Sequence, residues 1–307
     1  MSDAVVANSE VAIAQGSKSF AAAARIFDRA TRDDAVMLYA WCRHCDDVID
    51  GQTLGHAQEA DFRNGQQARL DLLRQQTAAV LAGEATSDPV FEALRRVVET
   101  HDIPARHPQE LLAGFAMDVA DRPYETIEDT LDYCYHVAGV VGVMMAMIMG
   151  TRDPVVLDRA SDLGLAFQLT NIARDVVDDA RAGRVYLPRE ILERHGISQI
   201  EPDDLAQRPA LHAAALELLD IAEAYYASAA IGMAALPPRS AWAIAAARRI
   251  YRAIGQQLRD GGPQAWDTRV STSKAQKLML LGISVGDVAA SRINRKATPR
   301  TGLWQRP

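Results

Sequence analysis

Apolar residues recur at three- and four-residue spacing along most of the chain, which is the spacing of one face of an α-helix. Alanine and leucine, both strong helix formers, are abundant within these stretches. Few segments show the two-residue alternation that is typical of a strand. The pattern therefore predicts an all-α protein, with helices over residues 20–27, 32–51, 62–82, 89–101, 108–119, 127–149, 154–180, 210–230, 240–260 and 273–292.

Short turns separate these predicted helices. Proline or glycine stands in the breaks at residues 102–104, 121–123, 236–238 and 261–263, and no break is long or low in complexity. The sequence has no repeat of fixed period. We therefore expect residues 1–307 to form one helical domain, with residues 1–15 and 292–307 as flexible tails.

Composition narrows the class of protein. Hydrophobic residues make up 49% of the chain and the formal net charge is -7, a balance that argues against a nucleic-acid binder. The longest apolar run, residues 137–150, is shorter than the roughly 20 residues of a membrane-spanning helix, so we interpret it as a core helix. The first fifteen residues do not resemble a secretory signal. The chain has three cysteines, a small and odd number that does not suggest a disulfide framework. This indicates a reducing compartment, so we expect a cytoplasmic protein.

The first cluster of candidate functional residues lies inside the predicted helix 32–51. Asp46 and Asp50 are four residues apart and share one helix face, with Asp47 beside them. Like charges at this spacing destabilise a helix unless a cation lies between them. A solvated acidic surface explains the cluster equally well when it is considered alone.

A second cluster repeats the spacing inside the predicted helix 154–180. Asp175 and Asp179 are four residues apart, and Asn171 lies one turn before them. Carboxylate and amide oxygens suit Mg²⁺, which bridges carboxylates to the phosphates of a substrate. Arg43 and Arg174 accompany the two clusters, either as partners in helix-stabilising ion pairs or as bidentate ligands of a diphosphate. The two clusters together favour the diphosphate site.

Weaker signals lie near these clusters. Residues 16–20 precede a helix and either bind a phosphate at its free N–H groups or form an ordinary N-cap through Ser17 or Ser19. Gly139 and Gly142 permit close approach of either a neighbouring helix or a long hydrocarbon. Tyr133 precedes them and is either a core residue or an aromatic face that stabilises a carbocation.

Two further motifs have simpler interpretations. Residues 42–45 match the C-x-x-C pattern, but no second cysteine pair or preceding strand supports a zinc or redox site, so we interpret both cysteines as small buried apolar residues. The segment from Ser291 onward is basic and free of acids. It either contacts an anionic membrane surface or is a solvated tail.

Taken together, these segments resemble the squalene/phytoene synthase family, in particular its bacterial carotenoid-forming members, over nearly the whole chain. The likeness is carried by residues 16–20 (GSKSF), 38–50 (LYAWCRHCDDVID), 133–142 (YCYHVAGVVG), 165–179 (LAFQLTNIARDVVDD), 184–188 (RVYLP) and 303–307 (LWQRP). The resemblance implies an isoprenoid synthase fold, with helices around a deep central active-site cavity.

The resemblance also implies roles for individual residues. Catalytic positions are Asp46, Asp47, Asp50, Asp175, Asp179 and Tyr133, and the ligands of Mg²⁺ or Mn²⁺ are Asp46, Asp50, Asn171, Asp175 and Asp179. Substrate contacts are Ser17, Lys18, Ser19, Phe20, Tyr39, Arg43, Asn171, Arg174, Tyr251 and Arg269. Gly16 stands where some relatives have histidine, which weakens the case for a phosphate contact at that position.

The implied activity is that of a prenyltransferase. Two geranylgeranyl diphosphates condense head to head through a cyclopropyl intermediate to phytoene, the first committed step of carotenoid biosynthesis, without NADPH. The alternative is a dehydrosqualene or squalene synthase that uses farnesyl diphosphate; a terpene cyclase and a non-catalytic scaffold also stay open. A di-iron bundle needs Glu-x-x-His pairs, and no histidine here has a glutamate three residues before it. We expect peripheral membrane contact for release of the apolar product.

Overall fold

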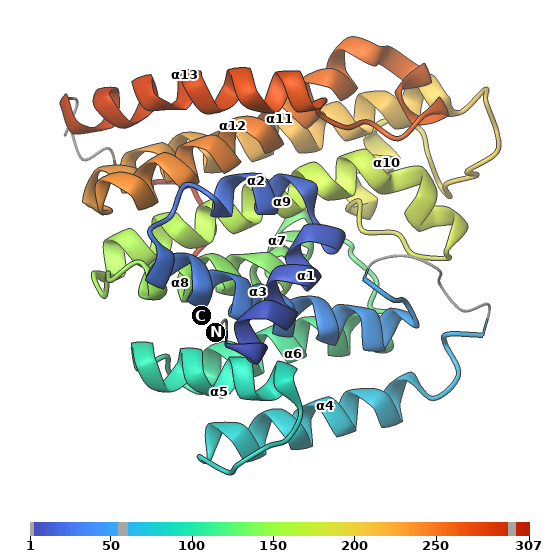
Figure 1. The fold of residues 1–307 in the computed structure, drawn as a ribbon. Helices are drawn as coiled ribbons and strands as arrows, with labels where there is room; N and C mark the ends of the chain where they lie inside the picture. Colours follow the sequence, from blue (N-terminus) through green and yellow to red (C-terminus); the bar gives the residue numbers. More distant parts are fainter. Residues whose placement is uncertain (1–2, 55–60, 294–298) are drawn as a thin grey trace.

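The computed structural model describes residues 3–54, 61–293 and 299–307, and within these ranges the chain is helical, without β-strands (Figure 1). The helices are α1 (Ala4–Gly16), α2 (Lys18–Ala24), α3 (Arg29–Asp50), α4 (Gln66–Leu81), α5 (Pro89–His101), α6 (Arg106–Val119), α7 (Ile127–Cys134), the π-helical turn η1 (Tyr135–Gly139), α8 (Val140–Ile148), α9 (Pro154–Arg181), α10 (Arg189–Arg194), α11 (Arg208–Gly232), the 3₁₀ turn η2 (Met233–Ala235), α12 (Pro238–Gly261), the 3₁₀ turn η3 (Gly262–Asp267) and α13 (Lys274–Ile293). The predicted all-α class is confirmed.

Capping residues explain where the long helices begin and end. The Asp28 side chain accepts a hydrogen bond of 3.0 Å from the Thr31 N–H at the start of α3. Asp153 caps α9 in the same way, with Pro154 in the first turn. The C-terminal end of α3 is capped by Gly51, whose φ of 59° is the left-handed conformation that glycine adopts without steric cost.

Helix α9 lies at the centre of the molecule. It packs against α8 and η1 on one side and against α11 and α12 on the other (Figure 1). The buried apolar side chains form a single cluster that includes residues from Ile13 to Ala265. That the chain forms one domain stays a prediction. The central position of α9 puts the helix that carries the second acidic cluster in contact with several other helices.

Close packing between α9 and the η1–α8 segment requires glycine. A Cβ at Gly142 would lie 2.3 Å from the carbonyl oxygen of Ala160, and one at Gly164 would lie 2.3 Å from that of Ala138. Both distances are far below van der Waals contact. The glycines of this stretch therefore allow close packing of a neighbouring helix. Of the two interpretations left open by the sequence, a helix or a long hydrocarbon, the structure supports the helix.

The helical stretch Ile127–Ile148 is the one part of the described chain long and apolar enough to cross a membrane, judged by length and composition alone. Of its most apolar window, 61% is buried inside the protein. Its position against α9 agrees with the interpretation as a core helix.

The expectation of flexible tails is corrected at both ends of the chain. Residues 4–16 form α1, which packs on α3 and α5, and Asp3 forms an ion pair of 2.5 Å with Arg96. At the other end, Arg300 pairs with Asp162 at 2.6 Å and Arg306 with Asp158 at 2.5 Å. Two basic residues of the tail that the sequence suggested for membrane contact therefore form ion pairs within the protein. Residues 294–298 lie outside the described part.

The three cysteines are free, and Cys45 and Cys134 are buried. Burial raises the pKa of the Cys42 thiol to about 12 and that of Cys45 well above its usual value. Protonated thiols are poor metal ligands and poor nucleophiles. The interpretation of residues 42–45 as part of the helix packing is therefore supported.

Candidate active site

The first acidic cluster lies in the last two turns of α3. Although 37% of the Asp46 side chain remains exposed, loss of hydration and the neighbouring carboxylates Asp50, Asp47 and Asp118 raise the pKa of Asp46 to about 7. Arg43 opposes this shift from a distance of 2.5 Å. Crowded carboxylates with a raised pKa are the arrangement that a bound cation relieves.

The other two aspartates of this cluster have partners within the protein. Asp47 accepts a hydrogen bond of 2.7 Å from the N–H of Leu54, which ties the loop after α3 to the helix. Asp50 forms an ion pair of 2.6 Å with Arg184, a residue that follows α9 in the chain. The helix that carries the first cluster is thus joined by an ion pair to the segment that follows the helix of the second cluster.

The second cluster lies on the C-terminal half of α9. The Nε of Arg174 donates to Asp175 at 2.8 Å. Burial raises the pKa of Asp179 well above its usual value, and Asp175 adds to the shift, whereas Arg184 and Arg174 oppose it. The side-chain oxygen of Asn171 is buried and lacks a hydrogen-bond partner among the described residues. An unpartnered acceptor of this kind is costly unless a ligand completes it.

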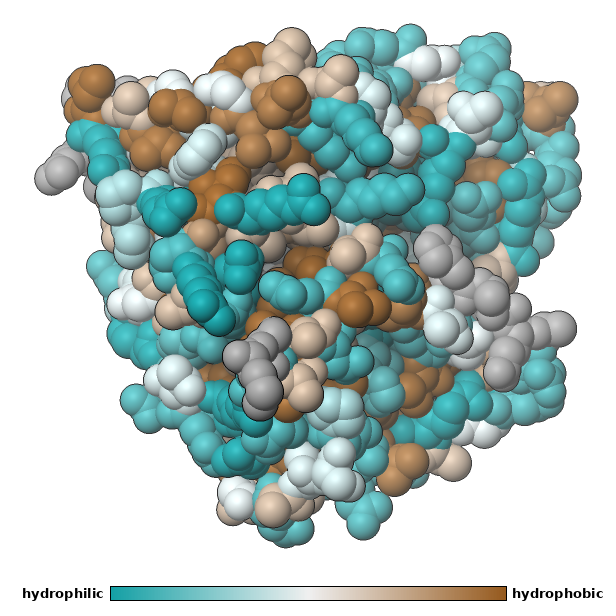
Figure 2. Space-filling view, in the orientation of Figure 1, coloured by the Kyte–Doolittle hydropathy of each residue, from teal (hydrophilic) through white to brown (hydrophobic). Residues whose placement is uncertain are grey.

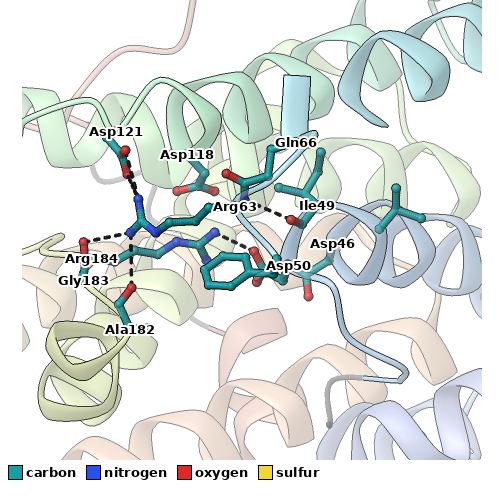
Figure 3. A network of polar contacts seen from close by, with 12 residues as sticks. Asp46, Ile49, Asp50, Arg63, Gln66, Asp118, Asp121, Ala182, Gly183 and Arg184 are labelled. Atoms are coloured by element: carbon teal, nitrogen blue, oxygen red, sulfur yellow. Dashed lines mark hydrogen bonds and ion pairs between the residues drawn. The ribbon is translucent and has the colours of Figure 1, made fainter. Parts of the chain in front are cut away.

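Arg184 is the cation that links the two clusters. Besides its ion pair with Asp50, its charge lowers the pKa of both Asp118 and Asp179. The ring of Phe62 lies 5.5 Å from its guanidinium group. Figure 3 shows Arg184 pointing toward Asp50 and Asp118.

Arg63 fixes the loop that carries Arg184. Its guanidinium group pairs with Asp121 at 2.8 Å and donates to the carbonyl oxygens of Ala182 and Gly183, each at 3.2 Å (Figure 3). These contacts hold the end of α9 against the end of α6. Arg63 is therefore a positioning residue for Arg184.

A half-buried carboxylate with two tyrosine partners completes this side of the site. Asp118 accepts hydrogen bonds from Tyr186 at 2.8 Å and from Tyr133 at 3.1 Å. Burial raises the pKa of Asp118 to about 6, with Arg184 opposing the shift. The rings of Tyr133 and Tyr186 stack with centroids 4.8 Å apart. The predicted residue Tyr133 thus lies beside Arg184 and the first cluster.

An aromatic cluster brings the N-terminal segment to the site. The ring of Phe20 lies 6.2 Å from that of Tyr39 and 5.2 Å from that of Tyr251, and Phe167 stacks on Tyr251 at 4.2 Å. Burial raises the pKa of Tyr251 to about 12, while the nearby Arg174 and Arg43 lower it. Tyr251 therefore lies near the arginines of both acidic clusters.

The remaining predicted contacts have distinct places. Ser17 accepts a hydrogen bond of 3.2 Å from the Phe20 N–H, so it is the N-cap of α2, and Lys18 and Ser19 begin that helix. Arg269 lies 3.8 Å from Asp175, with 66% of its side chain exposed. A Cβ at Gly16 would lie 2.5 Å from the Tyr39 hydroxyl oxygen, so a larger residue there requires Tyr39 to move.

The donor set fits a divalent cation. Four of the five predicted ligands are carboxylates, and the fifth supplies the unpartnered Asn171 oxygen. Within the described residues, no group of three or more acidic, histidine or cysteine side chains is close enough to hold a metal by itself. Mg²⁺ typically keeps several waters and takes phosphate oxygens as further ligands, so the set is suited to binding metal together with substrate.

A hollow of about 210 Å³ opens beside this centre and is lined by Asp118, Arg184 and Tyr186, among others. Pockets for small ligands typically measure roughly 300–1,000 Å³, so this hollow alone is smaller than a typical ligand pocket.

Some residues of the site were missed by the sequence analysis. Arg184 and Tyr186 lie in the segment 184–188, whose resemblance was noted without a role for either residue. The position of Arg184, a basic residue shortly after the second acidic cluster, could have indicated its role. Asp118 and Arg63 lie in no motif, so the sequence offered no comparable signal for them.

A family model described as squalene/phytoene synthase matches residues 13–276. The 15-cis-phytoene synthase of Paracoccus sp. (strain N81106 / MBIC 01143) is 58% identical over 307 residues, covering 100% of this chain and 99% of that protein. The phytoene synthase of Pseudescherichia vulneris is 53% identical over 296 residues, covering 96% of each.

Solved structures agree with the fold. A dehydrosqualene synthase crystallised in complex with a ligand superposes with a TM-score of 0.81 at 28% identity, covering 93% of this chain and 97% of that chain. A squalene synthase from Alicyclobacillus acidocaldarius gives a TM-score of 0.70 at 27% identity, covering 83% of this chain and 94% of that one.

Proposed function

The chain belongs to the squalene/phytoene synthase family, and on that basis we propose that it is a 15-cis-phytoene synthase. In this proposal it condenses two molecules of geranylgeranyl diphosphate head to head and supplies phytoene for carotenoid biosynthesis. The observation that carries the proposal is similarity over the whole chain to relatives named phytoene synthase, at 51–58% identity. The two acidic clusters joined by Arg184 support the same chemistry.

A divalent cation, Mg²⁺ or Mn²⁺, belongs to this proposal. Asp46, Asp50, Asn171, Asp175 and Asp179 would hold it. When bound, it supplies positive charge that neutralises a diphosphate leaving group. The raised pKa of Asp46 and of Asp179 and the unpartnered oxygen of Asn171 support this assignment.

The first half-reaction begins with cleavage of a C–O bond. Arg43 and Arg174 donate hydrogen bonds to the diphosphate, which leaves with the bonding electron pair, and an allylic cation remains. The double bond of the second substrate attacks this cation and forms a C–C bond. Loss of a proton closes the cyclopropane ring of prephytoene diphosphate, which keeps the second diphosphate. Asp46, Asp47, Asp50, Asp175, Asp179 and Tyr133 are the residues that we propose to surround these steps.

The second half-reaction repeats the ionisation. The remaining diphosphate leaves with the C–O bonding pair, the resulting cyclopropylcarbinyl cation rearranges to the central linkage, and loss of a proton gives phytoene. Phe20, Tyr39 and Tyr251 offer aromatic faces to the cation and exclude water. Ser17, Lys18, Ser19, Asn171 and Arg269 complete the proposed substrate contacts. The electrons balance without an external reductant, so we expect no requirement for NADPH.

Dehydrosqualene synthesis from farnesyl diphosphate is the alternative. The superposition with a dehydrosqualene synthase supports it at the level of the fold, at 28% identity. Several relatives named phytoene synthase are about twice as similar in sequence, at 51–58%, which favours the longer substrate. We also propose a cytoplasmic enzyme with peripheral membrane contact, since both substrate and product carry long hydrocarbon chains.

The test is incubation of the purified protein with geranylgeranyl diphosphate and Mg²⁺, without NADPH, followed by mass analysis of the extracted hydrocarbon. The expected result is phytoene, two diphosphates released for each phytoene formed, and loss of turnover when EDTA removes the metal. Consumption of farnesyl diphosphate alone, with dehydrosqualene as the product, would replace the proposal with the alternative. Hydrocarbon formation only in the presence of NADPH would indicate squalene synthesis.

A further inference from the structure

The outward face of α13 is apolar along most of its length. Between Leu278 and Ile293 every exposed residue is glycine, alanine or a larger apolar residue. The exposed fractions of the larger ones are 74% for Leu278, 57% for Met279, 45% for Ile283, 53% for Val285 and 86% for Ile293. Surface helices of globular proteins normally present polar residues to water. Contiguous exposed apolar residues mark a surface that contacts a partner or a membrane.

Polar residues in the C-terminal half of α13 point toward the protein instead. Ser284 is fully buried, and Asp287 forms an ion pair with Arg249 of α12. Arg292 donates to the carbonyl oxygen of Leu236 at 3.3 Å. The helix thus turns these polar groups inward, together with Leu281 and Val288, and leaves other apolar residues outside. Figure 2 shows hydrophobic residues gathered at the upper left, where Figure 1 places α13.

Charge at the two ends of α13 favours an anionic partner. The only acid of the helix, Asp287, is neutralised by Arg249, whereas Lys274 and Lys277 stand at its start and Arg292 at its end. A second copy of the chain placed on this face would bring basic ends together in either the parallel or the antiparallel orientation. An anionic lipid surface matches both the charge and the apolar residues.

The position of α13 connects this face to the proposed substrate site. Helix α13 packs on α12, and α12 carries Tyr251 and packs on α2. Lys18, the first residue of α2, lies close enough to Lys277 for the two charges to repel each other. The apolar face thus adjoins the N-terminal segment that carries Phe20.

We infer that α13 docks the protein on an anionic lipid bilayer, with Leu278, Met279 and Ile283 in the boundary between headgroups and acyl chains. The reason to expect a bilayer rests on the proposed function, because prenyl diphosphates and phytoene carry long hydrocarbon chains. The docking surface itself is measurable without substrate.

The experiment is flotation of the full-length protein with vesicles of phosphatidylcholine and phosphatidylglycerol. The wild-type protein should float with anionic vesicles, and the triple variant Leu278→Gln, Met279→Gln, Ile283→Gln should bind at least about tenfold more weakly, because the apolar contact is lost. The matched control is Leu72→Gln, Val155→Gln, Leu205→Gln, which changes three equally exposed apolar residues on other helices and loops and should bind like the wild type. Thermal unfolding and turnover in detergent micelles establish that each variant is folded.

A second measurement uses the wild-type protein alone. Anionic vesicles should slow amide hydrogen exchange in α13 and leave α4 unchanged. The inference is overturned if the α13 variant floats as well as the wild type, or if exchange in α13 is unaffected by vesicles. It is also overturned if the wild type is a dimer in solution that the α13 variant dissociates, since the occupant is then a second copy. Failure to form phytoene in micelles, with α13-dependent flotation intact, would reject the proposed function and leave the docking surface in place.

Discussion

At the scale of single residues, the site is organised by a balance of carboxylates and guanidinium groups. Each of three arginines contacts an aspartate: Arg43, Arg174 and Arg184. The positive charges of these arginines lower the pKa of the nearby carboxylates, but at Asp46 and Asp179 loss of hydration outweighs them and the pKa stays raised. The four-residue spacing predicted which aspartates share a face, because that spacing is a local property of a helix. The sequence did not predict the bridge from Asp50 to Arg184, since 134 residues separate them and only the folded chain brings them together.

Asp175 and Asp178 offer a matched test of the second cluster. Asp175 faces Arg174 with 19% of its side chain exposed, whereas Asp178 is 66% exposed and pairs with Arg181 on the surface. We expect Asp175→Ala to lower kcat at least about 100-fold, because a group that holds the leaving-group charge is lost. Asp178→Ala should turn over close to the wild-type rate.

Both variants should keep the helical circular dichroism spectrum of the wild type. The corresponding change in the first cluster, Asp46→Ala, should also abolish turnover. Wild-type rates from Asp175→Ala would contradict the assignment of the second cluster as a diphosphate and metal site. Equal losses from Asp175→Ala and Asp178→Ala would point to a general effect of negative charge on α9.

At the scale of helices, periodicity predicted each described helix longer than α1, because each buries one face and repeats apolar residues accordingly. Several shorter elements were not predicted, and three of them show why. Helix α1 has only two buried residues, Ser9 and Ile13, so it shows little apolar periodicity. Helix α10 has six residues, too few for a pattern. The π-helical turn from Tyr135 to Gly139 changes the register inside one predicted helix, and Gly139 within it packs closely against Leu165 and Ser161 of α9, a long-range contact that the local sequence does not indicate.

Glycines on two helices provide a test at this scale. The Cβ of Gly142→Ala would meet the Ala160 carbonyl oxygen at 2.3 Å, so we expect a loss of about 1–3 kcal/mol in the free energy of unfolding. Gly282→Ala on α13 meets nothing within 4 Å and should gain about 0.5–1 kcal/mol, since alanine favours the helix. Urea unfolding followed by circular dichroism measures both. A Gly142→Ala variant as stable as the wild type would disprove the need for close approach between α8 and α9.

At the scale of the whole molecule, the end of the described chain is part of the packed structure. The ring of Trp304 lies against that of Tyr135, with centroids 5.5 Å apart. The backbone N–H of Trp304 donates a hydrogen bond of 3.2 Å to the Tyr225 hydroxyl. Arg300 reaches the fully buried carboxylate of Asp162. Composition alone predicted a solvated or membrane-bound segment, because the basic residues gave no indication that their acidic partners lie on α9.

The contribution of this contact is measurable through Arg300→Ala. The variant leaves the buried Asp162 carboxylate with only the Ser228 hydroxyl and the nearby Arg159 as partners, and we expect a loss of about 1–3 kcal/mol in the free energy of unfolding. Arg306→Ala is the matched control. Its partner Asp158 has a 28% exposed side chain, so water compensates and the loss should be below about 1 kcal/mol. If chemical denaturation gives similar losses in the free energy of unfolding for both variants, the buried pair of Arg300 and Asp162 contributes no more than the more exposed pair of Arg306 and Asp158.

The ion pair between Arg300 and Asp162 also has a consequence for the order in which the protein is made. A ribosome synthesises Arg300 only 138 residues after Asp162, when α9 and the helices around it are already outside the exit tunnel. Until then, the buried carboxylate of Asp162 has only Arg159 and the Ser228 hydroxyl near it, so its full set of partners forms only after Arg300 is made. Ending the chain before Arg300 should therefore reduce the yield of folded enzyme more than removal of the same number of residues from the exposed loop after α10.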